Sequence, residues 1–468
     1  MPPLIGTTGA ASARGFGFLR ASTGTAAFLA TISSPSDFDI YGVATDSANN
    51  IIMVSGAGNS SLVKISKLGV TVWAKTFSGS FVTLNAVTVD SSDNIYVVGE
   101  IYSPGNYGII IKLDSSGNIL WQYKQDAGST TWYPRGMTWN SVKVMPNGNV
   151  AVAGVYKDNI QIYVCCCGNI KQTIRFGALA VYNSSGTLQW ARKFGSVSLS
   201  EPAANWTYSS VGVDSANNLY VSGSGANVSS SGNGAVPIIK YNSSGTYQWG
   251  YQYKNSSSTV SWDGWVNVDA SDNVWAVSTS IYQSYMLMVN TSGTYQWARN
   301  FTGSSLQFRF TSIAFDSSGL AYFGGTAYNG STTDVYDYGL MKMSSSGALQ
   351  YARSVGRDSG TSSNNEVAKS IAVSTDGFVS LGGRCDAATA ELFTRLKTDG
   401  SQTGTYSVNA ANYTYANFGI SAVSDTPSVT DATVTYPTNS GDYAMTYTSS
   451  AASATASTLS LTFSKTNL

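Results

Sequence analysis

Histidine is absent from this chain of 468 residues, and glutamate occurs only at Glu100, Glu201, Glu366 and Glu391. Without histidine the chain cannot form a Ser-His-Asp or Cys-His catalytic site, a histidine zinc site or a histidine proton relay. Charged residues make up only 11% of the chain, whereas soluble domains typically contain about 25%. We therefore expect a protein that binds or assembles and is not an enzyme.

The sequence also has no excess of charge and no long apolar run. Twenty-six basic residues balance 26 acidic ones, so no net field draws in nucleic acid or an anionic membrane. Residues 1–19 lack the basic start and apolar run of a signal peptide. The stretch 443–463 is long enough to span a bilayer but consists mostly of Ser, Thr and Ala. We expect no nucleic-acid partner and no membrane segment.

Cysteine is rare, with a Cys165-Cys166-Cys167 triplet and a lone Cys385. This spacing fits neither a CxxC metal pair nor a disulfide framework, so we interpret the four as small apolar fillers. It does not decide whether the triplet is oxidised. Turns such as Asp90-Ser-Ser-Asp-Asn94 suggest calcium, but they lack the glycine hinge and terminal glutamate of an EF-hand loop. Asx turns are the preferred interpretation, and we expect no metal and no cofactor.

What the chain does contain is a repeat. Its clearest copy is Ala86–Gly99 followed by Ile109–Trp121, and similar units begin near Val43, Val142, Val211, Val266, Ile313 and Ile371. Each unit holds four runs of period-two alternation, rich in Val, Ile and Tyr and separated by Gly, Asn and Asp turns. Four short strands repeated seven times predict an all-β fold, a seven-bladed β-propeller without long helices.

An aromatic residue closes the unit at a constant spacing from a polar residue. The six matching pairs are Asp114 and Trp121, Asn183 and Trp190, Asn242 and Trp249, Asn290 and Trp297, Ser344 and Tyr351, and, more loosely, Ser66 and Trp73. A residue that recurs once per blade serves the blade, so we expect these rings to pack between blades or against the sheet below.

The two ends of the chain depart from the repeat. We expect an N-terminal arm over residues 1–25, the propeller over 26–410 and a small β-rich C-terminal module over 411–468, which would pack on the propeller or on a neighbouring subunit. Residues 26–32 read as a strand that completes the seventh blade. Residues 403–408 are the rival closing strand, and the sequence does not choose between them.

The Asp/Asn-Ser-Ser-Gly-x-x-x-Trp units, with phrases such as Val89-Asp-Ser-Ser-Asp-Asn-Ile-Tyr-Val-Val-Gly99, resemble bacterial β-propeller repeats of surface and secreted proteins over residues 26–408. They are also similar to sialidase Asp boxes, although the aromatic residue follows later and no arginine triad is evident. The leader Met1–Phe18 resembles the Gly/Ala/Ser-Arg-Gly-Phe-Gly leaders of tailed-phage virion proteins, especially those of marine phages. That resemblance implies a virion location and an arm that contacts other virion proteins through Arg14, Phe16 and Phe18, in an oligomeric assembly.

Long insertions are expected on one face of the ring, formed by the loops between second and third strands and by the connections between blades. This variable face collects the candidate binding residues Trp132, Tyr133, Arg135, Trp139, Trp206, Tyr208, Trp262, Asp263 and Trp265. Exposed aromatic rings beside a few polar groups suit a cell-surface glycan or a protein partner. The alternative is that these rings fold back over their own loops.

Three functions are compatible with these features. The preferred one is a structural or adhesion protein of a phage tail or fibre, or a decoration protein, which would be assembled in the host cytoplasm and carried on the extracellular particle. A bacterial extracellular binding propeller is the second. A glycan hydrolase is the third, but it needs two carboxylates in one cleft, and the pairs Glu201 with Asp263 or Asp358 with Glu366 have no distinctive spacing.

Overall fold

The structure of the chain is a computed structural model that describes most of residues 27–467. The described ranges are 27–33, 39–56, 60–78, 82–102, 106–126, 136–164, 168–196, 206–225, 235–254, 263–279, 284–302, 306–328, 336–357, 366–385, 391–408, 411–417, 419–425, 428–431, 440–444, 448–451, 455–458 and 462–467. Arg14, Phe16 and Phe18 lie outside these ranges, so their contacts stay predictions.

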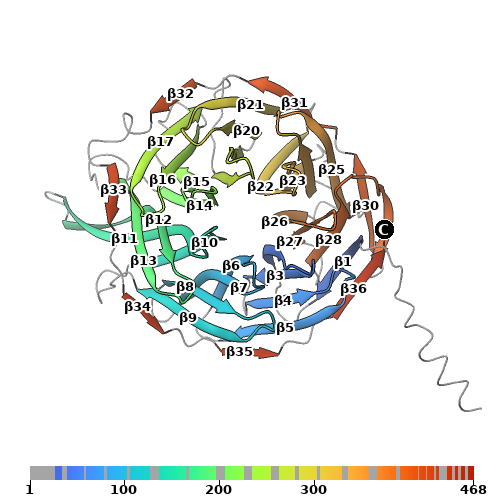
Figure 1. Cartoon of the computed structure of the whole chain (residues 1–468), viewed down its shortest axis with the longest axis horizontal. Helices are drawn as coiled ribbons and strands as arrows, with labels where there is room; N and C mark the ends of the chain where they lie inside the picture. Colours follow the sequence, from blue (N-terminus) through green and yellow to red (C-terminus); the bar gives the residue numbers. More distant parts are fainter. Residues whose placement is uncertain are drawn as a thin grey trace, which may run out of the picture.

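Seven antiparallel sheets surround a central axis and form a seven-bladed β-propeller (Figure 1). Every regular element in the described ranges is a strand, and none is a helix. The predicted all-β fold and its blade number are therefore confirmed. The second and third strands of a blade are buried almost throughout, as in β3 and β4 of the first blade, because neighbouring blades cover both of their faces.

Four strands form the body of each blade, running from the axis outwards. Blade 1 contains β2 (Ile40–Thr45), β3 (Ile51–Ser55), β4 (Ser61–Ile65) and β5 (Thr71–Ser78). Blade 2 contains β6 (Val82–Val89), β7 (Ile95–Tyr102), β8 (Asn106–Leu113) and β9 (Ile119–Asp126). Blade 3 contains β10 (Gly136–Val144), β11 (Val150–Val164), β12 (Gly168–Tyr182) and β13 (Leu188–Ser196). Blade 4 contains β14 (Trp206–Val213), β15 (Leu219–Gly225), β16 (Ala235–Tyr241) and β17 (Tyr247–Lys254).

The remaining three blades follow the same order. Blade 5 contains β18 (Asp263–Val268), β19 (Val274–Thr279), β20 (Ser284–Val289) and β21 (Tyr295–Thr302). Blade 6 contains β22 (Gln307–Phe315), β23 (Ala321–Tyr328), β24 (Tyr336–Met343) and β25 (Leu349–Arg357). Blade 7 contains β26 (Glu366–Ser374), β27 (Phe378–Cys385), β28 (Glu391–Lys397) and, from the N-terminal end, β1 (Phe28–Ser33).

The ring is closed by β1, the first described strand of the chain. Its register with β28 runs from Phe28 opposite Arg395 to Ile32 opposite Glu391. The rival closing segment forms β29 (Gly404–Val408), which pairs with β30 at the edge of blade 6. The strand that completes blade 7 is therefore supplied by residues 28–33, about 360 positions from its neighbour in sequence.

The C-terminal residues run around the rim of the ring in the direction opposite to the blade order (Figure 1). Each strand of this belt, as we call residues 411–467, pairs with the outer strand of a different blade. The belt strands are β30 (Ala411–Asn417) on blade 6, β31 (Ser421–Asp425) on blade 5, β32 (Ser428–Asp431) on blade 4, β33 (Ser440–Ala444) on blade 3, β34 (Thr448–Ala451) on blade 2, β35 (Thr455–Thr458) on blade 1 and β36 (Thr462–Asn467) on blade 7.

The β-rich C-terminal segment expected from residue 411 forms this belt, and it packs on the propeller, one of the two expected positions. Apart from the β29–β30 hairpin, the described belt strands pair with blades and not with one another. Strands of four to seven residues cannot build a core of their own. They can, however, satisfy the backbone groups of the exposed outer edge of each blade, and such edges otherwise promote association. The C-terminal segment thus belongs to the propeller.

The recurrent tryptophans join neighbouring blades, as the repeat predicts. The Nε1 atom of Trp121, for example, donates a hydrogen bond to the carbonyl oxygen of Ser184 in the next blade over 3.1 Å. Lys112 reaches the same carbonyl with Nζ at 3.1 Å. Equivalent indole bonds come from Trp73, Trp190, Trp249 and Trp297, and the Tyr351 hydroxyl replaces the indole in blade 6.

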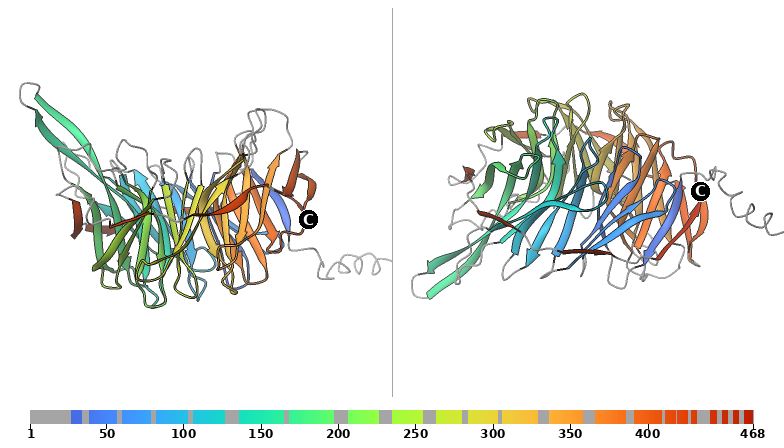
Figure 2. Two further views of the ribbon diagram at one scale, coloured as in Figure 1. Left: turned by 90° about the horizontal axis from the view of Figure 1, so that it is seen from above. Right: turned by 60° about the horizontal axis from the view of Figure 1, so that its bottom comes forward.

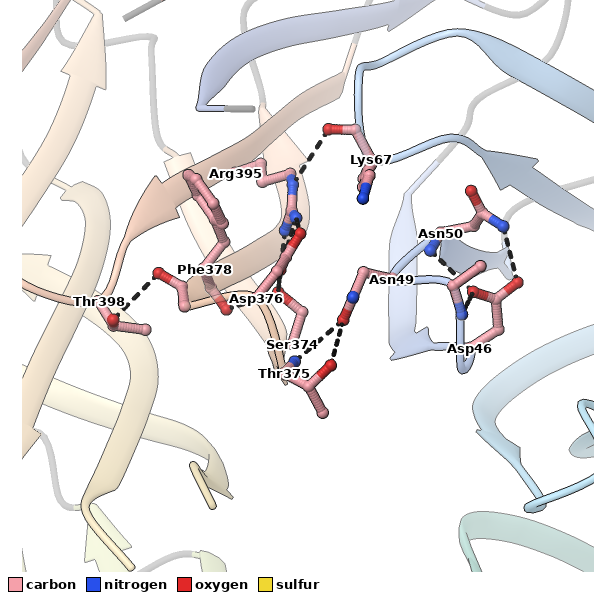
Figure 3. A network of polar contacts seen from close by, with 12 residues as sticks. Asp46, Asn49, Asn50, Lys67, Ser374, Thr375, Asp376, Phe378, Arg395 and Thr398 are labelled. Atoms are coloured by element: carbon pink, nitrogen blue, oxygen red, sulfur yellow. Dashed lines mark hydrogen bonds and ion pairs between the residues drawn. The ribbon is translucent and has the colours of Figure 1, made fainter. Parts of the chain in front are cut away.

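The junction between blades 7 and 1 is built differently (Figure 3). Phe28 faces Arg395 at the register position where Trp121 faces Lys112 in blade 2. Because the phenylalanine ring has no N–H to donate, Arg395 makes the bond to the next blade, from Nε to the carbonyl oxygen of Lys67 at 3.2 Å. The rest of its buried guanidinium is held by Ser374 and by both carboxylate oxygens of Asp376.

One hairpin extends beyond the ring (Figure 2). The strands β11 and β12 each have 15 residues, and they pair with each other along their whole length. Their neighbours are shorter: β10 pairs with β11 only as far as Lys157, and β13 pairs with β12 only as far as Gly177. The outer part of the hairpin is therefore a two-stranded ribbon, and the Cys165-Cys166-Cys167 triplet, between the two strands in sequence, lies outside the described residues.

Candidate functional site

Six of the seven innermost strands contain a one-residue bulge at the same level of the central channel. The extra residues are Tyr41, Asn85, Asn140, Ser209, Thr311 and Lys369. A bulge redirects the side chain of its extra residue, and all six line the central cavity. The inner strand of blade 5, β18, pairs without a shift, and Trp265 contributes to the cavity wall there.

A glycine in the second strand accommodates the bulge in five blades. Gly154 lies opposite Trp139, the residue before the bulge, and a Cβ at Gly154 would lie 2.0 Å from the carbonyl oxygen of Thr138. The same close approach occurs at Gly99, Gly223, Gly325 and Gly383. This contact explains why the second run of the repeat ends near glycine.

The bulge residues also connect the blades around the channel. Asn85 donates from Nδ2 to the carbonyl oxygen of Trp139 in the next blade at 2.9 Å, and Asn140 does the same toward Tyr208 at 2.9 Å. In blade 6 the Thr311 hydroxyl donates to the carbonyl oxygen of Ala368. These bonds hold the inner strands in fixed positions, so the cavity is preorganised.

The cavity on the axis has a volume of about 720 Å³ and is lined by all seven innermost strands. That volume lies within the range of about 300–1,000 Å³ of small-molecule sites. Its walls carry mainly Ala, Gly, Ser, Thr, Val and Asn, and its lining residues include no Asp or Glu. The two charged lining residues are Lys143 and Lys369.

The two lysines differ in their surroundings. Lys369 places Nζ 3.4 Å from Oδ2 of Asp39 and 3.7 Å from the ring centre of Tyr41, so its charge is compensated. Lys143 is partly buried, and none of the described residues forms an ion pair or hydrogen bond with its ammonium group. Burial lowers the pKa of Lys143, because desolvation disfavours the charged form.

Three of the predicted binding residues are not exposed. Trp139, Trp206 and Tyr208 have exposed fractions of 0%, 2% and 1%. Trp139 donates from Nε1 to Oε1 of Gln125, and Trp206 packs edge-on against Phe194 with ring centres 5.3 Å apart. The prediction that these three rings form an exposed recognition face is wrong, because they belong to the inner strands β10 and β14 and are covered by the adjacent blade.

The other predicted site residues are placed only in part. Trp265 is half-buried and lines the central cavity. Asp263 is the first residue of β18, and its side chain is not among those that the structure describes. Trp132, Tyr133, Arg135 and Trp262 lie outside the described residues. Their binding role therefore stays a prediction.

The predicted Asx turns are present. In the first turn of blade 2, Oδ1 of Asp90 accepts hydrogen bonds from the backbone N–H groups of Ser92 and Asn94 at 2.9 and 2.8 Å. Oδ2 of Asp90 accepts from the Asn94 amide at 2.9 Å. Among the described residues, no three His, Cys, Asp or Glu side chains lie together as a metal site would require, and no helix is long and apolar enough to cross a membrane.

The carboxylate pairs considered for hydrolysis are only partly placed. Glu366 is fully buried in blade 7 and accepts a hydrogen bond from Sγ of Cys385 at 3.3 Å. Cys385 is also buried, in agreement with its interpretation as a filler. Glu201 and Asp358 lie outside the described residues.

Sequence reasoning missed Lys143 and the bulge residues. A bulge inserts one residue and so breaks the period-two alternation by which strands are recognised. The recurring glycine of the second strand was a usable signal, because it marks the position opposite the bulge. For Lys143 the signal was a charged residue in an inner strand where the other repeats carry small or neutral residues.

Comparison with known proteins supports no assignment to a family. No family model matches the chain, and no curated protein matches it in sequence. Among solved structures, the WD40 β-propeller domain of Doa1 is similar with 12% identity and a TM-score of 0.44, covering 79% of this chain and 97% of that one. YCF48 bound to D1 peptide gives 12% identity, a TM-score of 0.43 and the same coverages. The Dos1 propeller gives 10% identity and a TM-score of 0.41, covering 77% and 93%.

Proposed function

We propose that this chain is a non-enzymatic structural and adhesion protein of a tailed-phage virion, a tail, fibre or decoration component whose propeller serves for assembly and recognition. The β-propeller is a rigid scaffold that suits binding and assembly. The leader at residues 1–18, similar to those of phage virion proteins, supports the location on a particle.

The observation that carries the proposal is the position of β1. This strand pairs with β28 on one side and with β36 on the other. A pulling force on the N-terminal leader would therefore act on β1, which is hydrogen-bonded along both edges to β28 and β36 from the C-terminal part of the chain. Such a strand suits a segment that anchors the ring to a particle.

The belt supports the same role. It pairs the outer edge of every blade, so the rim of the ring offers few open strand edges to other chains. Contacts with partners are then left to the two faces, the central cavity and the leader. A discrete ring of this kind can be presented in many copies on a particle without edge-to-edge association.

The test is to ask whether the chain is a component of purified particles. We expect mass spectrometry to find it there and gold-labelled antibodies to place it on the tail or the capsid surface. Deletion of residues 1–20 should lower incorporation, and replacing Arg14, Phe16 and Phe18 with Ala at constant length should have the same effect. Recovery of the chain only from host cells or their medium would contradict the virion role and favour a bacterial binding propeller.

A further inference from the structure

The seven inner strands allow an internal comparison at the level of Lys143. This residue lies three positions after the bulge residue Asn140 in β10. The residues at the same distance from the other bulges are Ala44, Thr88, Gly212, Ala314 and Ala372, and Asn267 takes the position in blade 5. Blade 3 alone places a charge at this level of the channel.

The charge of Lys143 is not balanced within the cavity. No lining residue is Asp or Glu, and the carboxylate of Asp39, which lies outside the lining, is engaged with Lys369. Its half-buried position and its lowered pKa both reflect a loss of hydration. A partly buried cation without a partner destabilises the fold, so its retention is explained if an anionic ligand binds there.

The remaining lining groups indicate what else that ligand carries. Asn85 and Asn140 use their Nδ2 groups on the neighbouring blades, and their Oδ1 atoms accept no hydrogen bond from the described residues. The Ser209 hydroxyl is likewise without a described partner. Trp265, a partly buried aromatic residue, also lines the cavity. Amide oxygens, a hydroxyl and an aromatic surface suit a ligand with several hydroxyl groups and one apolar face.

We propose that the central cavity binds a carboxylate-bearing sugar, with Lys143 forming the ion pair to its carboxylate. The cavity volume of about 720 Å³ accommodates a ligand of monosaccharide size. The inference rests on the recognition half of the proposed function, since it names the class of glycan component that the ring would recognise. Its residues are different from Trp132 and Trp262, the binding residues that the sequence predicts.

The test is a calorimetric titration of the purified full chain with glucuronate, with glucose and acetate as probes that lack one half of the ligand. We expect glucuronate to bind at least about tenfold more tightly than either, the equivalent of one charge-assisted hydrogen bond. Lys143→Met should weaken glucuronate binding at least about tenfold. Lys157→Met, on β11 of the same blade and outside the cavity, should leave binding unchanged.

Several results would overturn the site. These are absence of glucuronate binding, equal binding of glucose or of acetate, and unchanged binding by Lys143→Met. Thermal unfolding of Lys143→Met shows whether the variant is folded, and we expect its melting temperature to equal or exceed that of the wild type, because an unpaired cation is removed. Incorporation of the chain into particles is measured separately. If the chain binds glucuronate but is absent from particles, the virion role alone is contradicted. If the chain is incorporated but does not bind glucuronate, this site alone is contradicted.

Discussion

The Oδ1 atom of Asn49 accepts two hydrogen bonds from Thr375, one from its backbone N–H at 3.0 Å and one from its hydroxyl at 2.9 Å (Figure 3). The two residues are 326 positions apart and lie in the first turns of blades 1 and 7, where the ring closes. Asn49 has a φ of 62°, a conformation that asparagine tolerates better than most residues. Three other junctions carry a similar contact, in which Asp93, Asn217 and Asp272 each accept from a backbone N–H of the neighbouring blade through Oδ1. The tight turns therefore connect the blades as well as the strands.

Arg395 should be the side chain on which ring closure depends most. Replacing it with Met removes the bonds to Lys67 and Ser374 and deprives Asp376 of its cationic partner, although the Ser374 hydroxyl still donates to Asp376. We expect a loss of about 2 kcal/mol in the free energy of unfolding, less than the roughly 3–5 kcal/mol of a fully buried pair because Asp376 is partly exposed. Urea-induced unfolding measures this free energy. Lys67→Met, at an exposed position that keeps the backbone carbonyl accepting from Arg395, is the control, and an equal loss in both variants would contradict the account.

Glu391 should contribute a loss of stability as the pH rises through the neutral range. Burial raises the pKa of Glu391 to about 8 from its ordinary 4.5, and Asp39 adds to the rise, while the Cys385 N–H, Arg384 and Lys369 act in the opposite direction. The folded state therefore favours the protonated acid, and this contribution is complete below pH 4.5 and lost as the pH approaches 8.

The variant Glu391→Gln should remove this dependence, since a neutral amide occupies the same volume. We expect its melting temperature to exceed that of the wild type by about 2 °C or more at pH 8.5 and to differ little at pH 4.5. Differential scanning calorimetry at both pH values measures the effect. A constant difference across the range would show that Glu391 does not titrate between them.

The glycine opposite the bulge should not tolerate a side chain. Gly154→Ala would place Cβ 2.0 Å from the carbonyl oxygen of Thr138, so the bulge that carries Asn140 must shift. We expect a loss of at least about 2 kcal/mol in stability, as for other strained backbone sites. Gly136→Ala in the same blade is the matched control, because its Cβ would meet its nearest atom at 3.6 Å. Comparable losses in both variants would mean that the bulge is not the cause.

Removal of the belt should convert a discrete ring into an associating one. A chain that ends at residue 410 retains the four strands of every blade, but it exposes an outer edge on each, and we expect it to form oligomers or aggregates. Light scattering coupled to size-exclusion chromatography measures this. Removing only residues 462–468 uncovers β1 alone and should have a smaller effect. A monomeric chain of unchanged melting temperature after the longer truncation would refute the edge-covering role.

The blades were predictable from sequence because each is made of local hairpins with period-two alternation and a recurring Trp. The starts of the inner strands were not. The alternating phrase of blade 3 begins at Val142, after the bulge at Asn140, whereas β10 begins at Gly136. Trp139 was therefore assigned to a loop and is in fact a core residue.

The belt was unpredictable for a different reason. Its strands are short and rich in Ser, Thr and Ala, so their pattern indicates extended structure but no partner. Each pairs with a blade far away in the sequence, as Thr448 does with Asp126. Such pairing depends on the outer edges that the finished ring presents, and no local pattern encodes it.

The central claim, recognition by a rigid ring, is tested most directly by the binding of the purified chain to host cells. Trp132→Ala and Trp262→Ala should each lower binding at least about fivefold, since a stacking aromatic ring contributes about 1 kcal/mol or more, and both should leave the melting curve nearly unchanged. Trp139→Ala is the buried control and should lower the melting temperature, because it leaves a cavity in the core. Absence of any binding of the purified chain to host cells would contradict the recognition claim, whereas wild-type binding or unfolding of both loop variants would show that these two rings are scaffold and that recognition lies elsewhere on the ring.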